Sequence, residues 1–301
     1  MRITLSPSDK RKAFRRALSD PKIIRAPGAF LPLVAIEIER QGFEAVYLSG
    51  AVLAADLGLP DIGLTTLTEV ADRAEQFARV TNLPIILDCD TGFGEPMNVA
   101  RCVEIMEARG IAALQIEDQE MPKRCGHLDG KTLVSTEDML RRIRAATEAR
   151  CDPDTAIIAR TDAFASEGIN GVITRSIAYA GAGADVIFAE ALTGKEDWKA
   201  ATQAIPVPLL ANMTEFGKSV LLSADELQVL GASVVIYPVT LLRLAMGTTR
   251  HSLAEIAETG TQNRMISAMQ TRAELYDLLD YEAFNRFDSS IYNFTLRTDE
   301  D

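Results

Sequence analysis

Short apolar runs recur along the chain, and each is followed by a stretch in which apolar residues repeat with the period of a helix. The runs are rich in Val, Ile and Leu, and most do not alternate with polar residues, which is typical of strands buried on both faces. We therefore predict eight strands. They are Ile23–Ala26, Ala45–Leu48, Ile85–Leu87, Ala113–Ile116, Ala156–Ala159, Val186–Phe188, Val207–Ala211 and Val234–Tyr237.

The stretches between the runs predict helices. Several of them end in a glycine just before the next run, at the position where a helix C-terminus favours glycine. Near the N-terminus, Ser6 followed by Pro7 predicts the cap and first residue of a surface helix. The helices expected between strands are Leu31–Gln41, Leu67–Thr81, Val99–Arg109, Thr136–Ala149, Ile169–Ala180, Lys195–Ala204 and Ala224–Leu230.

Eight strand–helix units in about 250 residues are typical of the α/β class, and of a TIM-type (β/α)8 barrel in particular. No linker rich in Gly, Pro or Ser divides the chain, so we expect residues 1–301 to form a single barrel domain. Residues from about 250 to 301 exceed what a barrel needs. They predict a C-terminal helical extension that covers the barrel mouth or mediates oligomerisation.

The composition excludes several classes of protein. Hydrophobic residues make up 47% and charged residues 25%, which are globular values. The net charge of −12 argues against a nucleic-acid or anionic-membrane partner. No apolar run is long enough to span a membrane, and the N-terminus lacks an apolar signal segment. Four cysteines without disulfide or zinc spacing fit a reducing compartment, so we expect a cytoplasmic protein.

Polar residues follow nearly every predicted strand. The catalytic site of a (β/α)8 barrel lies at the C-terminal ends of its strands, so these residues predict a catalytic mouth. They are Tyr47 to Gly50, Asp88 to Asp90, Glu117 and Asp118, Arg160 to Asp162, Glu190, Asn212 and Arg243.

Three of these residues, Asp88, Asp90 and Glu117, form an acidic cluster. Asp88 and Asp90 lie on the same side of their strand, and Glu117 comes from the adjacent strand. Converging carboxylates repel one another unless a cation joins them, and oxygen ligands favour Mg²⁺, with Mn²⁺ as the alternative. Asp61 is either an outer partner of this site or a turn residue after Pro60.

The loop after the fourth strand carries Lys123-Arg124-Cys125-Gly126-His127. Two cations and an imidazole favour the thiolate form of the cysteine, which makes Cys125 a candidate for proton transfer or nucleophilic attack. Positive charge for an anionic substrate comes from Arg160, Arg243, Arg272, Lys123 and His127.

Two absences in the sequence narrow the chemistry of the site. The first argues against an aldolase, and the second indicates that the cations bind carboxylates rather than phosphates. Guanidinium groups bind carboxylates through paired hydrogen bonds. No lysine lies within a predicted strand, which argues against a Schiff-base aldolase. The segments after the seventh and eighth strands are not Gly-rich, so the usual phosphate site of this fold is not apparent.

These motifs resemble the isocitrate lyase/phosphoenolpyruvate mutase superfamily over about Phe14 to Tyr281. The loop sequence Lys-Arg-Cys-Gly-His is similar to that of its 2-methylisocitrate lyase branch, whereas isocitrate lyases usually carry Lys-Lys-Cys-Gly-His. The other matching segments are Tyr47 to Gly50, Gly58 to Asp61, Asp88 to Gly94, Ile116 to Gln119, Asn212 to Gly217 and Met269 to Arg272.

The resemblance implies a role for each candidate residue. Asp88 would bind Mg²⁺ directly, with Asp61, Asp90 and Glu117 acting through waters. Cys125 would protonate a carbanion, Tyr47 would handle a hydroxyl proton, and Lys123 and His127 would complete the catalytic set. The substrate-binding residues would be Ser49, Gly50, Ala51, Gly126, Arg160, Glu190, Asn212, Met213, Thr214, Arg243 and Arg272. Ala51 departs from the glycine that some members carry there.

The implied activity is the cleavage of 2-methylisocitrate to pyruvate and succinate, a step of propionate breakdown. The resemblance also implies a homotetramer with exchanged C-terminal helices. The alternatives are a related enzyme acting on isocitrate, a larger alkylmalate or oxaloacetate, and a non-catalytic metabolite-binding barrel. Phe188 and Ile236 are candidates for the pocket of the extra methyl group, although one methyl is worth only about 1–3 kcal/mol.

Overall fold

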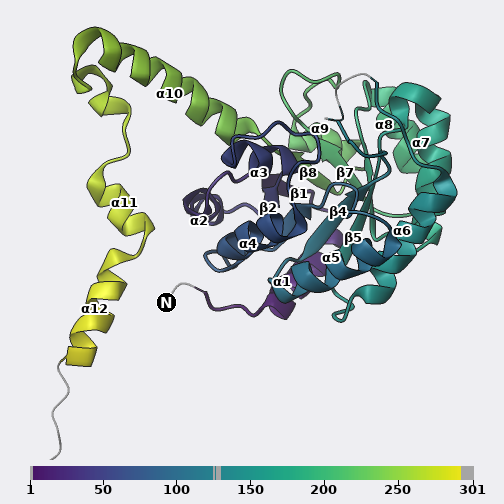
Figure 1. Cartoon of the computed structure of the whole chain (residues 1–301), viewed down its shortest axis with the longest axis horizontal. Helices are drawn as coiled ribbons and strands as arrows, with labels where there is room; N and C mark the ends of the chain where they lie inside the picture. The colour runs from purple at the N-terminus through teal and green to yellow at the C-terminus, as the bar shows by residue number, and fades with distance from the viewer. Residues whose placement is uncertain (1–2, 125, 127–129, 293–301) are drawn as a thin grey trace, which may run out of the picture. The chain divides into compact units, whose positions relative to one another are not determined.

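The computed structural model describes residues 3–124, 126 and 130–292, and its strands and helices alternate along the chain (Figure 1). The strands are β1 Ile24–Pro27, β2 Val46–Leu48, β3 Ile85–Asp88, β4 Ala113–Glu117, β5 Ala156–Thr161, β6 Val186–Ala189, β7 Leu209–Asn212 and β8 Val234–Tyr237. The helices around them are α1 Pro7–Leu18, α2 Pro32–Arg40, α3 Gly50–Asp56, α4 Leu67–Ala78, α5 Pro96–Ala108, α6 Thr136–Ala149, α7 Phe164–Gly181, α8 Lys195–Ala204 and α9 Ala224–Val229. All eight predicted strands are confirmed to within two residues at their ends.

The eight strands form one parallel sheet in the order β1-β8-β7-β6-β5-β4-β3-β2. A parallel bridge between Gly28 and Tyr47 joins the two outer strands, β1 and β2, and the Ala29 amide donates to the Tyr47 carbonyl at 3.0 Å. Gly28 is required here, because a Cβ atom would lie 2.1 Å from the carbonyl oxygen of Pro238. The sheet thus closes into the predicted (β/α)8 barrel.

Helix α1 closes the N-terminal end of the barrel. Ser6 accepts from the Asp9 amide and caps the helix, with Pro7 as the first residue, as predicted. Phe14 is fully buried against the residues that fill the barrel interior at the strand starts. The ammonium of Lys10 donates to the carbonyls of Ala78 and Thr81 at 2.8 and 2.6 Å, which satisfies acceptors at the end of α4. Helix α1 therefore covers the end of the barrel opposite the mouth.

Helix α3 was not among the predicted helices. It begins at Gly50, two residues after β2 ends, and spans seven residues. A helix of about two turns is too short for its apolar residues to show a helical repeat, and it directly follows the apolar run of β2.

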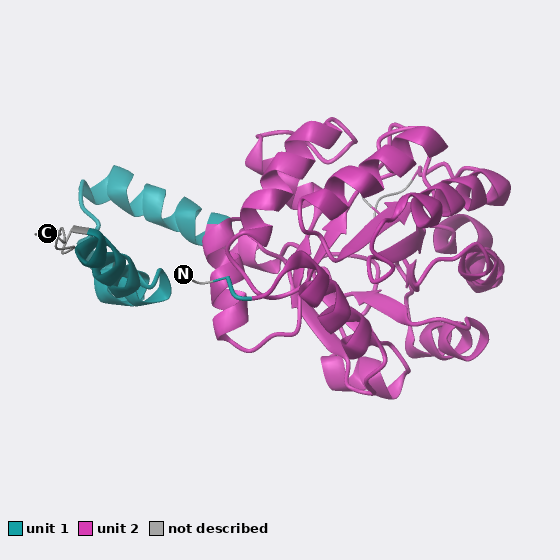
Figure 2. Cartoon of the chain, turned by 90° about the horizontal axis from the view of Figure 1, so that it is seen from below, with its two compact units in different colours: residues 1–4, 246–301 teal, residues 5–245 magenta. Residues whose placement is uncertain are grey.

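The chain divides into two compact units, Leu5–Ala245 and Met246–Asp301 with Met1–Thr4 (Figure 2). Helix α10, Thr240–Thr259, begins in the barrel unit, and none of its side chains is buried. It is followed by η1 Asn263–Ala268, α11 Arg272–Leu278 and α12 Tyr281–Tyr292. The extension expected from about residue 250 is thus helical. That residues 1–301 form a single domain stays a prediction.

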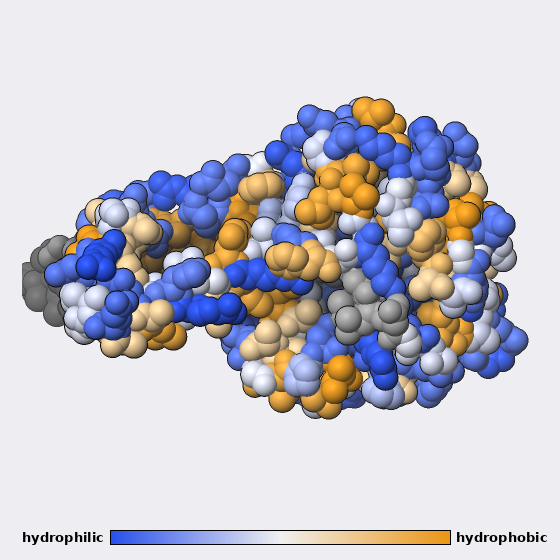
Figure 3. Space-filling view, turned by 90° about the horizontal axis from the view of Figure 1, so that it is seen from above, coloured by the Kyte–Doolittle hydropathy of each residue, from blue (hydrophilic) through white to orange (hydrophobic). Residues whose placement is uncertain are grey.

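The helices after β8 expose many large apolar side chains, some of which are visible as orange spheres in Figure 3. No helix in the described parts of the chain is both long and apolar enough to cross a membrane. The exposed apolar residues are Leu244, Met246, Leu253, Ile256, Ile266, Met269, Tyr276, Leu279, Tyr281, Phe284, Phe287 and Ile291.

Candidate active site

The carboxylate of Asp88 is held in place by three N–H groups at the end of β3. Its Oδ1 atom accepts from the Asp90 amide at 3.1 Å and from Nε2 of Gln115 at 3.0 Å. Its Oδ2 atom accepts from the Gly50 amide at 3.1 Å. A Cβ atom on Gly50 would lie 2.9 Å from Asp90 and 3.1 Å from Asp88, so only glycine leaves room for both carboxylates.

Asp90 lies beside Asp88 in the left-handed backbone region, with φ of 49°. Burial and the carboxylate of Asp88 raise the pKa of Asp90 to about 6, although Lys123 opposes the rise. The Lys123 ammonium, which is 3% exposed, lies 2.7 Å from Asp90 Oδ1 and also contacts Asp61. Lys123 therefore joins the two acidic residues Asp90 and Asp61, which come from different loops.

Glu117 completes the acidic cluster at the end of β4 and is 1% exposed. Its Oε2 atom lies 3.3 Å from Nη1 of Arg160, whereas Oε1 is buried without a hydrogen-bond partner among the described residues. Burial raises the pKa of Glu117 well above its usual value, although Arg160 opposes the rise. A buried carboxylate oxygen without a partner is costly, which indicates that a further cation or donor belongs there.

These observations fit a divalent cation with oxygen ligands. The carboxylate of Asp88 raises the pKa of both Asp90 and Glu117, and one Glu117 oxygen has no partner among the described residues. Within the described residues, no three His, Cys, Asp or Glu side chains form a complete chelating group. A site with one or two protein carboxylates and several waters is the arrangement that Mg²⁺ prefers.

Arg160 lies at the centre of the other half of the mouth. It donates from Nε and Nη2 to Asp162 at 2.9 and 3.1 Å, and its Nη2 atom lies 3.6 Å from Glu190. Its guanidinium also lies over the Phe188 ring, 5.1 Å from the centroid. The strand register explains this grouping, because Arg160 pairs with Glu117 on one side and Phe188 on the other.

A cavity of about 90 Å³ at the strand ends brings the candidate residues together. Its residues come from seven strand ends and the loops between them, so the predicted convergence is found in the barrel mouth. They are Tyr47, Ser49, Ala51, Asp61, Asp88, Lys123, Arg124, Gly126, Arg160, Phe188, Glu190, Asn212, Thr214, Ile236, Pro238, Val239 and Arg243.

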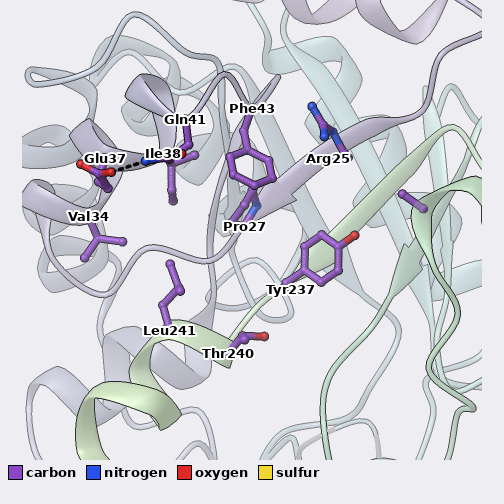
Figure 4. A pocket seen from close by; sticks show the side chains of 11 residues that line it. Arg25, Pro27, Val34, Glu37, Ile38, Gln41, Phe43, Tyr237, Thr240 and Leu241 are labelled. Atoms are coloured by element: carbon purple, nitrogen blue, oxygen red, sulfur yellow. Dashed lines mark hydrogen bonds between the residues drawn. The ribbon is translucent and has the colours of Figure 1, made fainter. Parts of the chain in front are cut away.

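A larger cavity of about 520 Å³ lies outside the barrel, between α2 and the start of α10 (Figure 4). The rings of Phe43 and Tyr237 and the side chain of Leu241 line it. Three of its polar groups already have partners: Gln41 donates to Glu37 at 2.6 Å, Arg25 donates to Glu44, and the Thr240 hydroxyl donates to Glu215. We therefore place the chemistry in the smaller cavity.

The loop after β4 is held over the mouth by two side chains. Gln119 donates to the Arg124 carbonyl at 2.8 Å and accepts from the Arg124 amide at 2.9 Å. Lys131 donates to the Gly126 carbonyl and lies 2.8 Å from Asp162. Cys125 and His127 lie outside the described residues, but the residues on either side of Cys125 line the cavity.

Comparison with known proteins identifies the family. The sequence model of phosphoenolpyruvate phosphomutase matches residues 14–257. The chain belongs to this family. Its superfamily, isocitrate lyase/phosphoenolpyruvate mutase, is the one predicted from the motifs.

Curated members of this superfamily are similar over nearly the whole chain. The probable 2-methylisocitrate lyase 1 of Corynebacterium glutamicum is 58% identical over 286 residues, covering 95% of this chain and 94% of that one. The 2-methylisocitrate lyase of Bacillus subtilis is 46% identical over 279 residues, covering 92% of each chain. Both relatives are lyases, as the sequence predicted, and they do not favour the alternatives.

Solved structures are also similar to this chain. Phosphonopyruvate hydrolase in complex with oxalate and Mg²⁺ superposes with a TM-score of 0.84 at 30% identity, covering 93% of this chain and 98% of that one. Lyases of the superfamily are metal-dependent.

One predicted substrate contact, Met213, lies away from the cavity lining, and contact of Arg272 with substrate stays a prediction. Met213 is buried in the hydrophobic core, and its sulfur accepts from the Leu222 amide at 3.2 Å, so its side chain does not line the cavity. Arg272 is exposed at the start of α11, in the C-terminal unit. The other predicted substrate residues line the cavity or, like Gly50, adjoin Asp88.

Sequence reasoning missed Gln115 and Gln119, which hold site residues in place. Gln115 is fully buried on β4, two residues before Glu117, and so lies on the same side of the strand. A polar side chain inside an apolar strand was the available signal, because buried polar groups need partners.

Proposed function

We propose that this chain is a Mg²⁺-dependent carbon–carbon lyase that cleaves 2-methylisocitrate to pyruvate and succinate. The observation that carries the proposal is the convergence of Asp88 and Arg160 on one small cavity at the strand ends, with Glu117 3.3 Å from Arg160. Acidic and basic side chains both line that cavity, which suits a metal-bound polycarboxylate. The names of the relatives support the choice of substrate.

We propose Asp88 as the direct protein ligand of the metal, with Asp61, Asp90 and Glu117 holding its waters. The three N–H donors to Asp88 keep that carboxylate oriented. When bound, Mg²⁺ supplies Lewis-acid stabilisation of negative charge on the substrate oxygens. Mn²⁺ has similar ligand preferences and is the alternative ion.

The substrate carboxylates would be bound by the cations and neutral donors that line the cavity. Arg160 is fixed by its two bonds to Asp162, so its remaining N–H groups are oriented before substrate binds. Arg243 reaches the cavity while donating to Thr214 and to the Glu215 carbonyl at 3.3 and 2.7 Å. Asn212 has a buried Oδ1 atom without a partner in the described chain, and it can accept from a substrate hydroxyl.

Cleavage would begin as the 2-hydroxyl group, which donates a hydrogen bond to the Tyr47 oxygen, loses its proton to solvent. The bond between C2 and C3 then breaks, C2 becomes the carbonyl carbon of pyruvate, and the electron pair moves to the succinate carbon. The Cys125 thiol protonates that carbon and becomes a thiolate. Lys123 and His127, which are close to it in the sequence, would supply positive charge, and Ser49, Gly50, Ala51 and Gly126 would enclose the substrate so that water is excluded.

Product analysis tests this proposal. Pyruvate and succinate release from 2-methylisocitrate is expected with Mg²⁺ and is lost in EDTA. Glyoxylate release from isocitrate at comparable kcat/KM would instead make the chain an isocitrate lyase. Cys125→Ser is expected to lose most turnover while binding substrate, and wild-type turnover of this variant would remove the cysteine from the mechanism.

We also propose that the protein is a homotetramer with exchanged C-terminal helices. The apolar cavity between α2 and the start of α10 is open on the barrel, and the C-terminal helices carry a dozen exposed large apolar residues. Patches of this kind usually mark an interface. Light scattering of the full chain is expected to give four copies, and Leu253→Glu is expected to lower that number. A monomeric wild type would contradict the proposal.

We infer a cytoplasmic location. Cys89, Cys102 and Cys151 are all unpaired, and free thiols persist in reducing compartments. Fractionation of the native host should recover the activity with cytoplasmic markers, and recovery with exported proteins would contradict the inference.

A further inference from the structure

Gln115 connects two residues with different proposed roles. It lies on β4, pairs in register with Asp88 on β3, and is fully buried. Its Nε2 atom donates to Asp88 Oδ1 at 3.0 Å, and its Oε1 atom accepts from the Tyr47 hydroxyl at 2.7 Å. One amide thus bridges the candidate metal ligand and the candidate proton-handling residue.

Chemistry fixes the orientation of this amide. An ionised carboxylate has acceptors only, so the NH₂ group of Gln115 has to face Asp88. The carbonyl oxygen then faces Tyr47 and accepts its hydroxyl hydrogen. A rotation of the amide by 180° would place two acceptors in contact at Asp88, which is unfavourable in a buried site.

The bond has a consequence for Tyr47. Its hydroxyl hydrogen is directed to Gln115, so the lone pairs of the same oxygen remain for a group in the cavity that Tyr47 lines. Burial and the negative charge of Asp88 raise the pKa of Tyr47 well above its usual value, so the phenol stays neutral. Tyr47 therefore presents an acceptor to the substrate hydroxyl.

The bond has a second consequence for Asp88. Its Oδ1 atom already accepts from two donors, Gln115 and the Asp90 amide, whereas Oδ2 accepts from one. These three hydrogen bonds thus hold the Asp88 carboxylate in one orientation. Partners that orient a metal ligand in this way typically contribute about 10- to 100-fold to metal affinity or activity.

We propose that Gln115 is a positioning residue that couples the orientation of the Asp88 carboxylate to the direction of the Tyr47 hydroxyl. The expected effects on kcat rest on the proposed lyase function. The expected effect on Mg²⁺ affinity does not, because it is measured without substrate.

Gln115→Met tests the coupling, because methionine has a similar length and volume but cannot replace either hydrogen bond. Gln203→Met, on the exposed end of α8, is the matched control. Mg²⁺ affinity is measured by calorimetry without substrate. We expect the dissociation constant to rise by about 10- to 100-fold in Gln115→Met. We expect Gln203→Met to stay within about threefold of wild type, and Tyr47→Phe to raise the dissociation constant less than Gln115→Met does, because it leaves the bond from Gln115 to Asp88 in place.

Kinetics provide the second arm. Tyr47→Phe and Gln115→Met are each expected to lower kcat more than they change KM. The double variant should lose little more than the worse single variant, because the two residues act through one chain of bonds. Gln115→His, which retains one donor and one acceptor, should recover part of both losses. If Gln115→Met does not fold, Gln115→His and Gln115→Leu replace it in both arms.

Unchanged Mg²⁺ affinity in a folded Gln115→Met protein, or kcat losses that multiply in the double variant, would overturn the proposal. Failure of the proposed function gives a different result. In that case the wild type releases no pyruvate from 2-methylisocitrate. The Mg²⁺ titrations then still decide whether Gln115→Met changes the dissociation constant.

Discussion

The ammonium of Lys123 lies 2.7 Å from Oδ1 of Asp90, inside the acidic cluster. Burial lowers the pKa of Lys123, but the surrounding carboxylates of Asp90 and Asp88 raise it, and the net shift is upward. The lysine is therefore a permanent cation that reduces the repulsion between carboxylates.

Lys123→Met should make the barrel depend on metal for stability. Removing one partner of a buried ion pair costs about 3–5 kcal/mol. In EDTA we expect the melting temperature to fall by roughly 5–10 °C. Added Mg²⁺ should raise it more in the variant than in the wild type, because the ion replaces the lost charge. Differential scanning calorimetry measures both values, and equal melting temperatures in EDTA would show that Lys123 is not needed for charge balance.

Asp88→Asn should abolish the response to Mg²⁺ while leaving the fold intact. The amide keeps the shape of the side chain but replaces one acceptor oxygen with a donor and removes the charge. We expect turnover to fall by about 10²–10⁴-fold, with no recovery at high Mg²⁺. Asp225→Asn, exposed in the first turn of α9, is the control and should keep full activity. Recovery of Asp88→Asn at high Mg²⁺ would assign the ligand role to another carboxylate.

Gly126→Ala should damage activity far more than stability. A Cβ atom at residue 126 would lie 2.5 Å from both Arg160 Nη2 and Glu190 Cγ, so the loop has to move away from the mouth. We expect kcat/KM to fall by about 10²-fold, since small misplacements near the reacting groups have effects of this size. Gly181→Ala is the matched control, because nothing lies within 4 Å of the added atom. Equal kcat/KM for the two variants would show that the loop need not approach Arg160.

Glu44 should make stability depend on pH in the acid range. Burial raises its pKa, but hydrogen bonds from Arg25 and Lys22 lower it more, to about 2. A folded pKa below the unfolded value means that the stabilisation is present above about pH 4.5 and is lost as the pH falls towards 2.

Glu44→Gln therefore should lower the free energy of unfolding at pH 7 by about 1–2 kcal/mol, after allowance for solvent screening of this partly exposed group. Urea titrations at several pH values measure the difference, which should shrink below pH 4.5. Exposed Glu148→Gln should have little effect at any pH. A difference that stays constant down to pH 3 would rule out the ion pairs as its cause.

The strand positions could be predicted because a parallel sheet buried on both faces requires continuous apolar runs. The grouping of Asp88, Glu117 and Arg160 followed from the rule that strand ends meet at one edge. The contacts of Lys123 with Asp90 and Asp61 could not be predicted, because they depend on the path of the loop after β4.

The role of Gln115 required the register between β3 and β4, which apolar patterns do not specify to the residue. The lack of space at Gly126 likewise depends on side chains from β5 and β6, far away in the sequence. The sequence thus identified the charged residues of the site, but which of them contact one another depends on strand register and on the path of the loops.

The junction between β1 and β2 is held by one bridge, Gly28 to Tyr47, whereas every other neighbouring strand pair shares at least two residue pairs. Tyr47 thus belongs to the strand pair with the fewest paired residues. Thermal breathing of the barrel should start there, and the Ala29 amide should exchange its hydrogen with solvent earlier than the central strands do. In that case, loss of catalytic geometry would precede global unfolding on heating.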